Sequence, residues 1–155
     1  MKILLALDGS GCSEAALAEV AERPWPADTQ VRVVSVVEPA APLMAEPYVV
    51  AGGYFEEVER IKRQQADDVV GRARLRLSAA TTTPLQVSVE VLPGSPRRVI
   101  VEEAEKWGAD LIVMGSHGYR TWERMLLGSV SQTVAAHAPC SVQIVHCKKA
   151  VTSDE

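Results

Sequence analysis

The chain has 155 residues, of which 47% are hydrophobic, and a formal net charge of −4. This length fits one domain, and a domain of this size buries roughly 70% of its unfolded surface, so its core needs neither disulfides nor a metal. The acidic balance excludes a basic footprint for nucleic acid. No apolar run reaches the ~18 residues of a membrane span.

The three cysteines, Cys12, Cys140 and Cys147, are widely spaced and form no C-x-x-C motif. An odd number in this pattern is typical of reduced thiols in a cytosolic protein. The chain enters an apolar run after one lysine, without a signal-peptide layout. We therefore expect a cytoplasmic protein whose thiols are free and inert.

The first half of the chain predicts two strands, a helix and a loop. Residues 2–7 form an apolar run too continuous for a half-exposed strand, which predicts a central strand of a parallel sheet. Residues 13–23 predict a helix that ends at the prolines following it. Residues 31–37 are rich in β-branched side chains and predict a second strand, and residues 38–53 predict a long loop.

A long helix is predicted next, over residues 54–79, with its charges on a solvated face. Its apolar stripe comprises Phe55, Val58, Ile61, Ala66, Val69, Ala73 and Leu77. Residues 85–92 alternate between apolar and polar side chains, which predicts a half-exposed strand at a sheet edge.

Two more helices and two more strands complete the pattern. Ser95 and Pro96 have the residue types of an N-cap and a first helical position, and Gly108 ends the helix that they begin. Residues 111–114 and 141–146 predict strands, with a helix between them. The alternation predicts one α/β domain over residues 1–147, a parallel sheet with helices on both faces, and a solvated tail over residues 148–155.

The loop between the last two predicted strands carries the strongest functional signal. Gly115, Gly118 and Gly128-Ser129 follow the spacing Gly-x2-Gly-x9-Gly-Ser. Glycine lets a ligand approach the main chain without meeting a Cβ, and Ser129 opens a helix whose N-terminus attracts anions. The loop predicts a cradle in which glycine N–H groups hold phosphates. It is neither a Walker loop nor Gly-x-Gly-x-x-Gly, and the alternative is a loop that only turns the chain.

This spacing, with Met-Gly-Ser-His-Gly before it and Leu-Leu-Gly-Ser-Val-Ser after it, resembles the nucleotide-binding branch of the universal stress protein family. The resemblance covers essentially the whole chain. It implies a five-stranded parallel, doubly wound sheet of order 3-2-1-4-5, whose reversal between strands one and four is where such folds bind ligands. It also implies ATP as the ligand, accompanied by Mg²⁺, and a homodimer paired through the last strand.

The resemblance assigns the nucleoside side of the site. Asp8 matches the acidic residue beside the adenosine, although it also suits an N-cap of the first helix. Val36 matches the residues that hold the adenine ring, although it also suits plain core. The same resemblance adds three residues to the ligand-binding set: Ala6, which stands where many relatives carry proline, Met114 and Val130.

The phosphate side follows from the loop. Gly115, Gly118, Gly128 and Ser129 match the phosphate and ribose loop of the family, and Ser131 lies one step further into the helix. The loop also contains His117, which we interpret as a packing or hydrogen-bonding residue. Arg120 and Arg124 suit two roles, neutralising phosphates or facing solvent. Bulky residues over 119–124 replace a more glycine-rich segment, so the resemblance extends to the end points of the loop but not to its conformation.

No catalytic constellation accompanies the loop. Residues 9–11 lack the nucleophile-elbow spacing, and no kinase-type Asp and Asn pair is present. We therefore expect an ATP-binding stress-response regulator with little or no hydrolysis. The alternatives are an interaction module of the same fold that binds no nucleotide, a weak ATPase, and an enzyme of a related fold, which the missing Ser-Gly-Gly-x-Asp-Ser loop disfavours.

Overall fold

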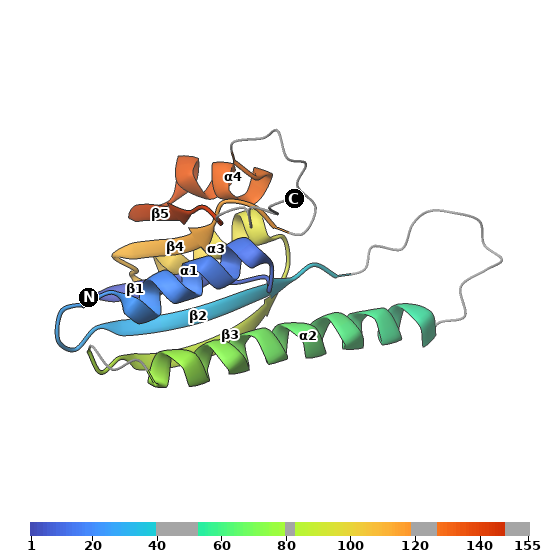
Figure 1. Ribbon diagram of the computed structural model, residues 1–155. Coiled ribbons are helices and arrows are strands. Elements are labelled where there is room, and N and C mark those ends of the chain that lie inside the picture. Colours follow the sequence, from blue (N-terminus) through green and yellow to red (C-terminus); the bar gives the residue numbers. More distant parts are fainter. Residues whose placement is uncertain (40–52, 80–82, 119–126, 148–155) are drawn as a thin grey trace, which may run out of the picture.

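The computed structural model describes residues 1–39, 53–79, 83–118 and 127–147. Five strands and four helices alternate in these ranges, which confirms the predicted α/β class (Figure 1). The elements are β1 (Lys2–Ala6), α1 (Gly11–Glu22), β2 (Gln30–Val37), α2 (Gly53–Ser78), β3 (Gln86–Pro93), α3 (Pro96–Trp107), β4 (Leu111–Gly115), α4 (Ser129–His137) and β5 (Ser141–Val145).

All strand pairs in the sheet are parallel, and the order is β3-β2-β1-β4-β5. The continuous apolar run of β1 lies at the centre, where Ile3, Leu4 and Leu5 have no exposed surface. The alternating strand β3 lies at an edge, where one of its faces meets solvent. Both placements, and the order that the family resemblance implied, are confirmed.

Helices cover both faces of the sheet and divide the core in two. On one face, α1 and α2 pack against β1, β2 and β3 through residues such as Leu17, Val20 and Ala73. On the other, α3 and α4 pack through Ile100, Ala104 and Val134 against Leu4, Ile112 and their neighbours. Since both faces of β1 and β4 are covered, a ligand can reach these strands only at their ends.

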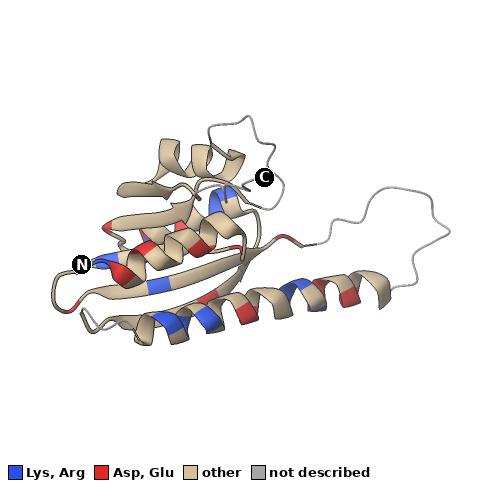
Figure 2. Ribbon diagram, viewed as in Figure 1, with Lys and Arg blue, Asp and Glu red and all other residues tan. Residues whose placement is uncertain are grey.

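Helix α2 is much longer than the sheet that it covers (Figure 1). Its buried side chains begin at Ala66, and Ile61 remains 44% exposed. Phe55 and Val58 are half-buried, so the predicted apolar stripe is only partly covered over the N-terminal half of the helix. Acidic and basic residues alternate along this helix, as expected for a solvated face (Figure 2). None of the helices in the described ranges is long and apolar enough to cross a membrane.

Candidate functional site

The loops that follow β1 and β4 meet at the carboxyl ends of the sheet. The two strands are parallel neighbours, with Ala6 opposite Met114. The chain continues from β1 towards β2 on one side, whereas β4 leads to β5 on the other. Strand order thus reverses between them, and such a switch point is where open α/β sheets bind ligands. The hydroxyl of Ser10 donates to the carbonyl oxygen of His117 across this junction, at 3.2 Å.

The loop after β1 is organised by side chains. The Asp8 carboxylate accepts a hydrogen bond from the Ser10 N–H at 2.9 Å, and Gly9 turns the chain with a φ of 81°. Ser10 is the N-cap of α1, and its hydroxyl accepts from the N–H of Ser13 at 3.3 Å. This cap starts the helix at Gly11, earlier than predicted. The alternative reading of Asp8 as the helix cap is therefore wrong, and its carboxylate stays exposed at the end of β1.

Glycines are required at both ends of the loop after β4 because neighbouring atoms lie too close to leave room for a side chain. A Cβ on Gly115 would lie 2.6 Å from the Cys12 carbonyl carbon, and one on Gly118 would lie 2.7 Å from an Asp8 carboxylate oxygen. A Cβ on Gly128 would lie 3.1 Å from the carbonyl oxygen of Ser116. Two of these three neighbours are backbone atoms, which cannot move aside as a side chain can. The glycines thus bring protein segments together, a role that the sequence did not indicate.

Ser116 joins the second loop to its neighbours, and the sequence analysis missed it. Its N–H donates to the carbonyl oxygen of Val145 at 2.9 Å, and its own carbonyl oxygen accepts from the Gly128 N–H at 2.7 Å. Its hydroxyl lies 2.9 Å from Nδ1 of His117, consistent with the packing role expected for that histidine. The only sequence signal was its position directly after a buried strand, between two glycines.

Helix α4 presents its N-terminus to the loop. The Gly128 N–H donates to the carbonyl oxygen of Ser116, and its contact with a phosphate stays a prediction. Helix geometry also leaves the N–H groups of residues 129–131 without intrahelical acceptors. The Ser129 side chain is exposed there. The hydroxyl of Ser131 is buried and donates to the carbonyl oxygen of Ser116 or Gly128, each at 2.9 Å, so it fixes the loop.

The apolar candidates line the carboxyl ends of the strands. Ala6 and Met114 are buried, with 8% and 5% of their surface exposed. Val36, near the end of β2, and Val130, in the first turn of α4, are half-buried against the same cluster. Their side chains contribute to the core between the sheet and helices α3 and α4. Arg120 and Arg124, together with the bulky segment around them, lie outside the described residues.

The cysteines depart from the prediction of three free thiols. Cys12 and Cys147 are joined by a disulfide, with their Cα atoms 4.5 Å apart, and Cys140 is free. The pairing brings together residues separated by 135 positions. Sequence spacing could not reveal it, because the fold places the ends of β1 and β5 on the same edge of the sheet. The sequence argument from unpaired cysteines for a reducing compartment therefore no longer applies.

The junction combines a helix N-terminus, which attracts anions, with an exposed carboxylate and with apolar residues that belong to the adjoining core. Among the described residues, no group of three or more His, Cys, Asp or Glu is placed to hold a metal ion. Nucleotide phosphates suit a helix N-terminus, while a carboxylate suits hydroxyl or amine donors. These features define an α/β protein with a candidate ligand site at the switch point of a five-stranded parallel sheet.

The chain belongs to the universal stress protein family, whose family model matches residues 1–146. A universal stress protein of Thermus aquaticus is 34% identical over 143 residues, covering 92% of this chain and 96% of its own. One from Methanocaldococcus jannaschii is 33% identical over 144 residues, covering 93% and 81%. The solved structure of UspA from Lactobacillus plantarum superposes with a TM-score of 0.76 at 26% identity, covering 94% and 97%.

Two further solved structures of this fold are described with ligands. A universal stress protein in complex with cAMP has a TM-score of 0.68 at 23% identity, covering 96% of this chain and 98% of its own. A universal stress protein family protein of Arabidopsis thaliana with AMP bound has a TM-score of 0.59 at 17% identity, covering 100% and 97%. At these identities the likeness establishes the shared fold alone.

Proposed function

We propose that this chain binds an adenine nucleotide, ATP in particular, at the junction of β1 and β4, and that it works as a nucleotide-responsive stress regulator. The observation that carries the proposal is the interlocking of two loops at the switch point. There the exposed Ser129 at the start of α4 and the exposed Asp8 carboxylate border one junction. Related structures that hold cAMP and AMP lend support, because they have the same fold.

Each side of the junction suits one part of a nucleotide. The free N–H groups and positive dipole of α4, with the Ser129 hydroxyl, suit the phosphates. Asp8 can accept hydrogen bonds from ribose hydroxyls or the adenine amine, and the half-buried Val36 offers apolar surface to the base. Mg²⁺ would accompany the phosphates of ATP. The proposed role is binding with little or no hydrolysis, since no general base is assigned to the site.

The test is a charge placed at the helix end. Ser129→Asp puts a carboxylate at the N-terminus of α4, which favours the helix but repels a phosphate. We expect ATP affinity to fall about 100-fold, or roughly 2.7 kcal/mol, while adenosine affinity stays nearly unchanged. Ser129→Asn, of similar size and neutral, is the matched control and should lose far less. Calorimetry with both ligands measures these effects, and equal ATP affinity in the Asp and Asn variants would contradict the phosphate assignment.

Mass spectrometry of the denatured protein asks whether an adenine nucleotide co-purifies. A purified chain without nucleotide that also binds none in calorimetry would instead support the alternative, an interaction module that works without nucleotide.

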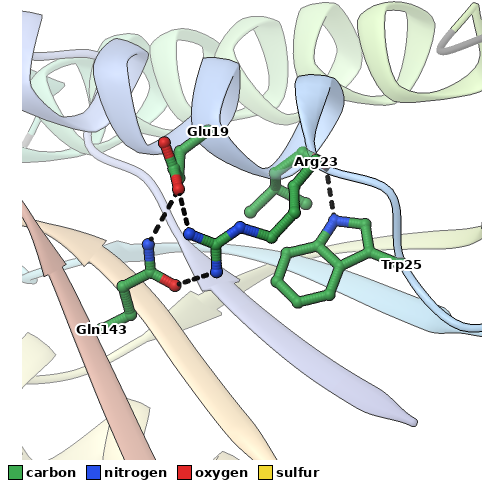
Figure 3. Close-up of polar contacts among 5 residues, drawn as sticks. Glu19, Arg23, Trp25 and Gln143 are labelled. Carbon is green, nitrogen blue, oxygen red and sulfur yellow. Dashed lines mark hydrogen bonds and ion pairs between the residues drawn. The ribbon is translucent and has the colours of Figure 1, made fainter. Parts of the chain in front are cut away.

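We also propose that the protein is a homodimer paired through β5. This strand lies at the sheet edge, and no described strand pairs with its outer side. Gln143, at its centre, is fixed from α1: its side chain accepts from Arg23 at 3.1 Å and donates to Glu19 at 3.2 Å, while Arg23 also contacts Glu19 (Figure 3). An exposed edge invites pairing with another chain. Light scattering at micromolar concentration should report a dimer, and a monomer would exclude this pairing.

A further inference from the structure

The Cys12–Cys147 pair borders the candidate nucleotide site. Cys12 lies in the first turn of α1, directly after the loop that holds Asp8, and is buried. Cys147 lies two residues beyond the end of β5 and is exposed. Because β4 lies between β1 and β5 in the sheet, the bridge links the segments on either side of the β4 loop.

Cys12 itself, and the strand that ends just before Cys147, contact the chain at the end of β4. The Cys12 backbone lies against Gly115 so closely that a Cβ there would overlap it. The hydroxyl of Ser116 donates to the Cys12 sulfur at 3.8 Å, and the Ser116 N–H donates to Val145, two residues before Cys147. The same serine accepts from Gly128 at the start of α4. The bridge therefore acts on the segment that connects the two halves of the site.

We propose that Cys12 and Cys147 form a reversible thiol–disulfide site, oxidised by low-molecular-weight disulfides and reduced by low-molecular-weight thiols, whose closure strengthens nucleotide binding. The proposal rests on the proposed function, because the property it regulates is nucleotide affinity at the same junction.

The exchange balances in two steps. The Cys147 thiolate attacks one sulfur of a small disulfide, RSSR, forming a mixed disulfide and releasing RS⁻. The Cys12 thiolate then attacks the Cys147 sulfur, closes the bridge and releases the second RS⁻; the two protons of the protein thiols go to the two departing thiolates. The net reaction converts two protein thiols and RSSR into the protein disulfide and two RSH. Excess RSH reverses it, beginning at the exposed Cys147 sulfur.

The exposure of the two sulfurs decides which one reacts with small molecules. Cys147 is exposed whereas Cys12 is buried, so an external thiol attacks Cys147 and Cys12 is the leaving group. The third cysteine, Cys140, has a thiol whose pKa is raised by burial and, in smaller part, by the charge of Asp110. Cys140 also remains unpaired, which makes it the natural control.

Forming the disulfide orders the site before the nucleotide binds. The oxidised chain joins the start of α1 covalently to the segment after β5, and the β4 loop is hydrogen-bonded to Cys12 and to the end of β5. Reduction leaves only hydrogen bonds and packing between them, so ordering them on binding costs free energy. We expect reduction to weaken ATP binding by about 5-fold through this loss of preorganisation.

The experiment equilibrates the full chain in glutathione buffers of increasing oxidised fraction, with alkylation and mass spectrometry to count free thiols. We expect the number of free thiols to change reversibly from three to one. Peptide mapping should then locate the disulfide between Cys12 and Cys147. Calorimetry of ATP binding to the fully oxidised and fully reduced protein then measures the affinity ratio.

Cys147→Ser should bind ATP like the reduced protein in every buffer, whereas Cys140→Ser should retain the full response. Thiols that stay free at all glutathione ratios, or equal ATP affinity in the two redox states, would overturn the inference while leaving ATP binding intact. Absence of ATP binding in both states would instead remove the proposed function, and the regulation with it.

Discussion

The two loops at the carboxyl ends of β1 and β4 are held in place by different kinds of contact. The loop after β1 is short and is shaped by side chains, since the Asp8 carboxylate accepts from the Ser10 N–H and the Ser10 hydroxyl caps α1. The loop after β4 is shaped by backbone contacts, for which Gly115 and Gly128 leave room. The first therefore offers a carboxylate, and the second brings a helix N-terminus to the same junction. In the proposed function, the nucleoside binds beside the loop after β1 and the phosphates bind at the N-terminus of α4.

The largest effect is expected where the two loops touch. Gly115→Ala would place a Cβ 2.6 Å from the backbone of Cys12, which must shift together with the start of α1. Overpacking of this kind costs up to about 3 kcal/mol, which for a domain of this size lowers Tm by roughly 6–12 °C. Thermal denaturation followed by circular dichroism measures the change.

Gly71→Ala is the matched control, because a Cβ at this position inside α2 meets no atom within 4 Å. Removing a glycine from a helix interior should stabilise the protein by about 0.5–1 kcal/mol. If Gly115→Ala behaved like Gly71→Ala, the close contact between the loops would not be a feature of the folded protein.

The next largest effect should be confined to the second loop. Gly128 has an extended backbone, with φ −70° and ψ 158°, which a β-branched residue can adopt. Gly128→Val would nevertheless press on the carbonyl oxygen of Ser116 and move the loop relative to α4. We expect ATP affinity to fall about 50-fold, or roughly 2.3 kcal/mol, and adenosine affinity to fall much less.

Ala135→Val, on the exposed side of the same helix, controls for the added bulk and should leave ATP affinity unchanged. Equal losses for ATP and adenosine in Gly128→Val would show that the second loop does not discriminate phosphates.

The smallest effect on affinity should come from a change in the loop after β1, and it should be the same for ligands with and without phosphates. Asp8→Ala removes an acceptor on the nucleoside side, so ATP and adenosine should each lose about 10-fold, as for one hydrogen bond to a charged group. Asp8→Asn keeps an acceptor for the Ser10 N–H and removes the charge. A gain in ATP affinity in Asp8→Asn would place the carboxylate beside the phosphates and contradict the proposed division.

The order of elements and the central strands could be predicted because a strand that is buried on both faces has a continuous run of apolar residues. The continuous apolar runs of β1 and β4 and the alternation of β3 each have one physical explanation, and the structure confirms them. Strand order came from the family resemblance, since local patterns carry no information on which strands are neighbours.

Other features depend on contacts that no local pattern encodes. The apolar residues at the start of α2 continue the helical stripe, yet Ile61 is exposed because the sheet ends before the helix does. Gly115 reads as a ligand-binding glycine, whereas the structure has it packed under α1. The Cys12–Cys147 bridge and the bonds of Ser116 likewise depend on which strand ends meet. The sequence predicts which segments form the candidate site but not the contacts that hold these segments together.

The central claim is that the N-terminus of α4 and the loop before it bind the phosphates, while the loop after β1 binds the nucleoside. The most direct test is calorimetry of the unaltered protein with adenosine, AMP and ATP under the same salt and Mg²⁺ conditions. We predict that affinity rises in that order, because each added phosphate gains charge-assisted contacts at the helix N-terminus. Equal affinity for adenosine and ATP, or tighter binding of adenosine, would contradict the claim.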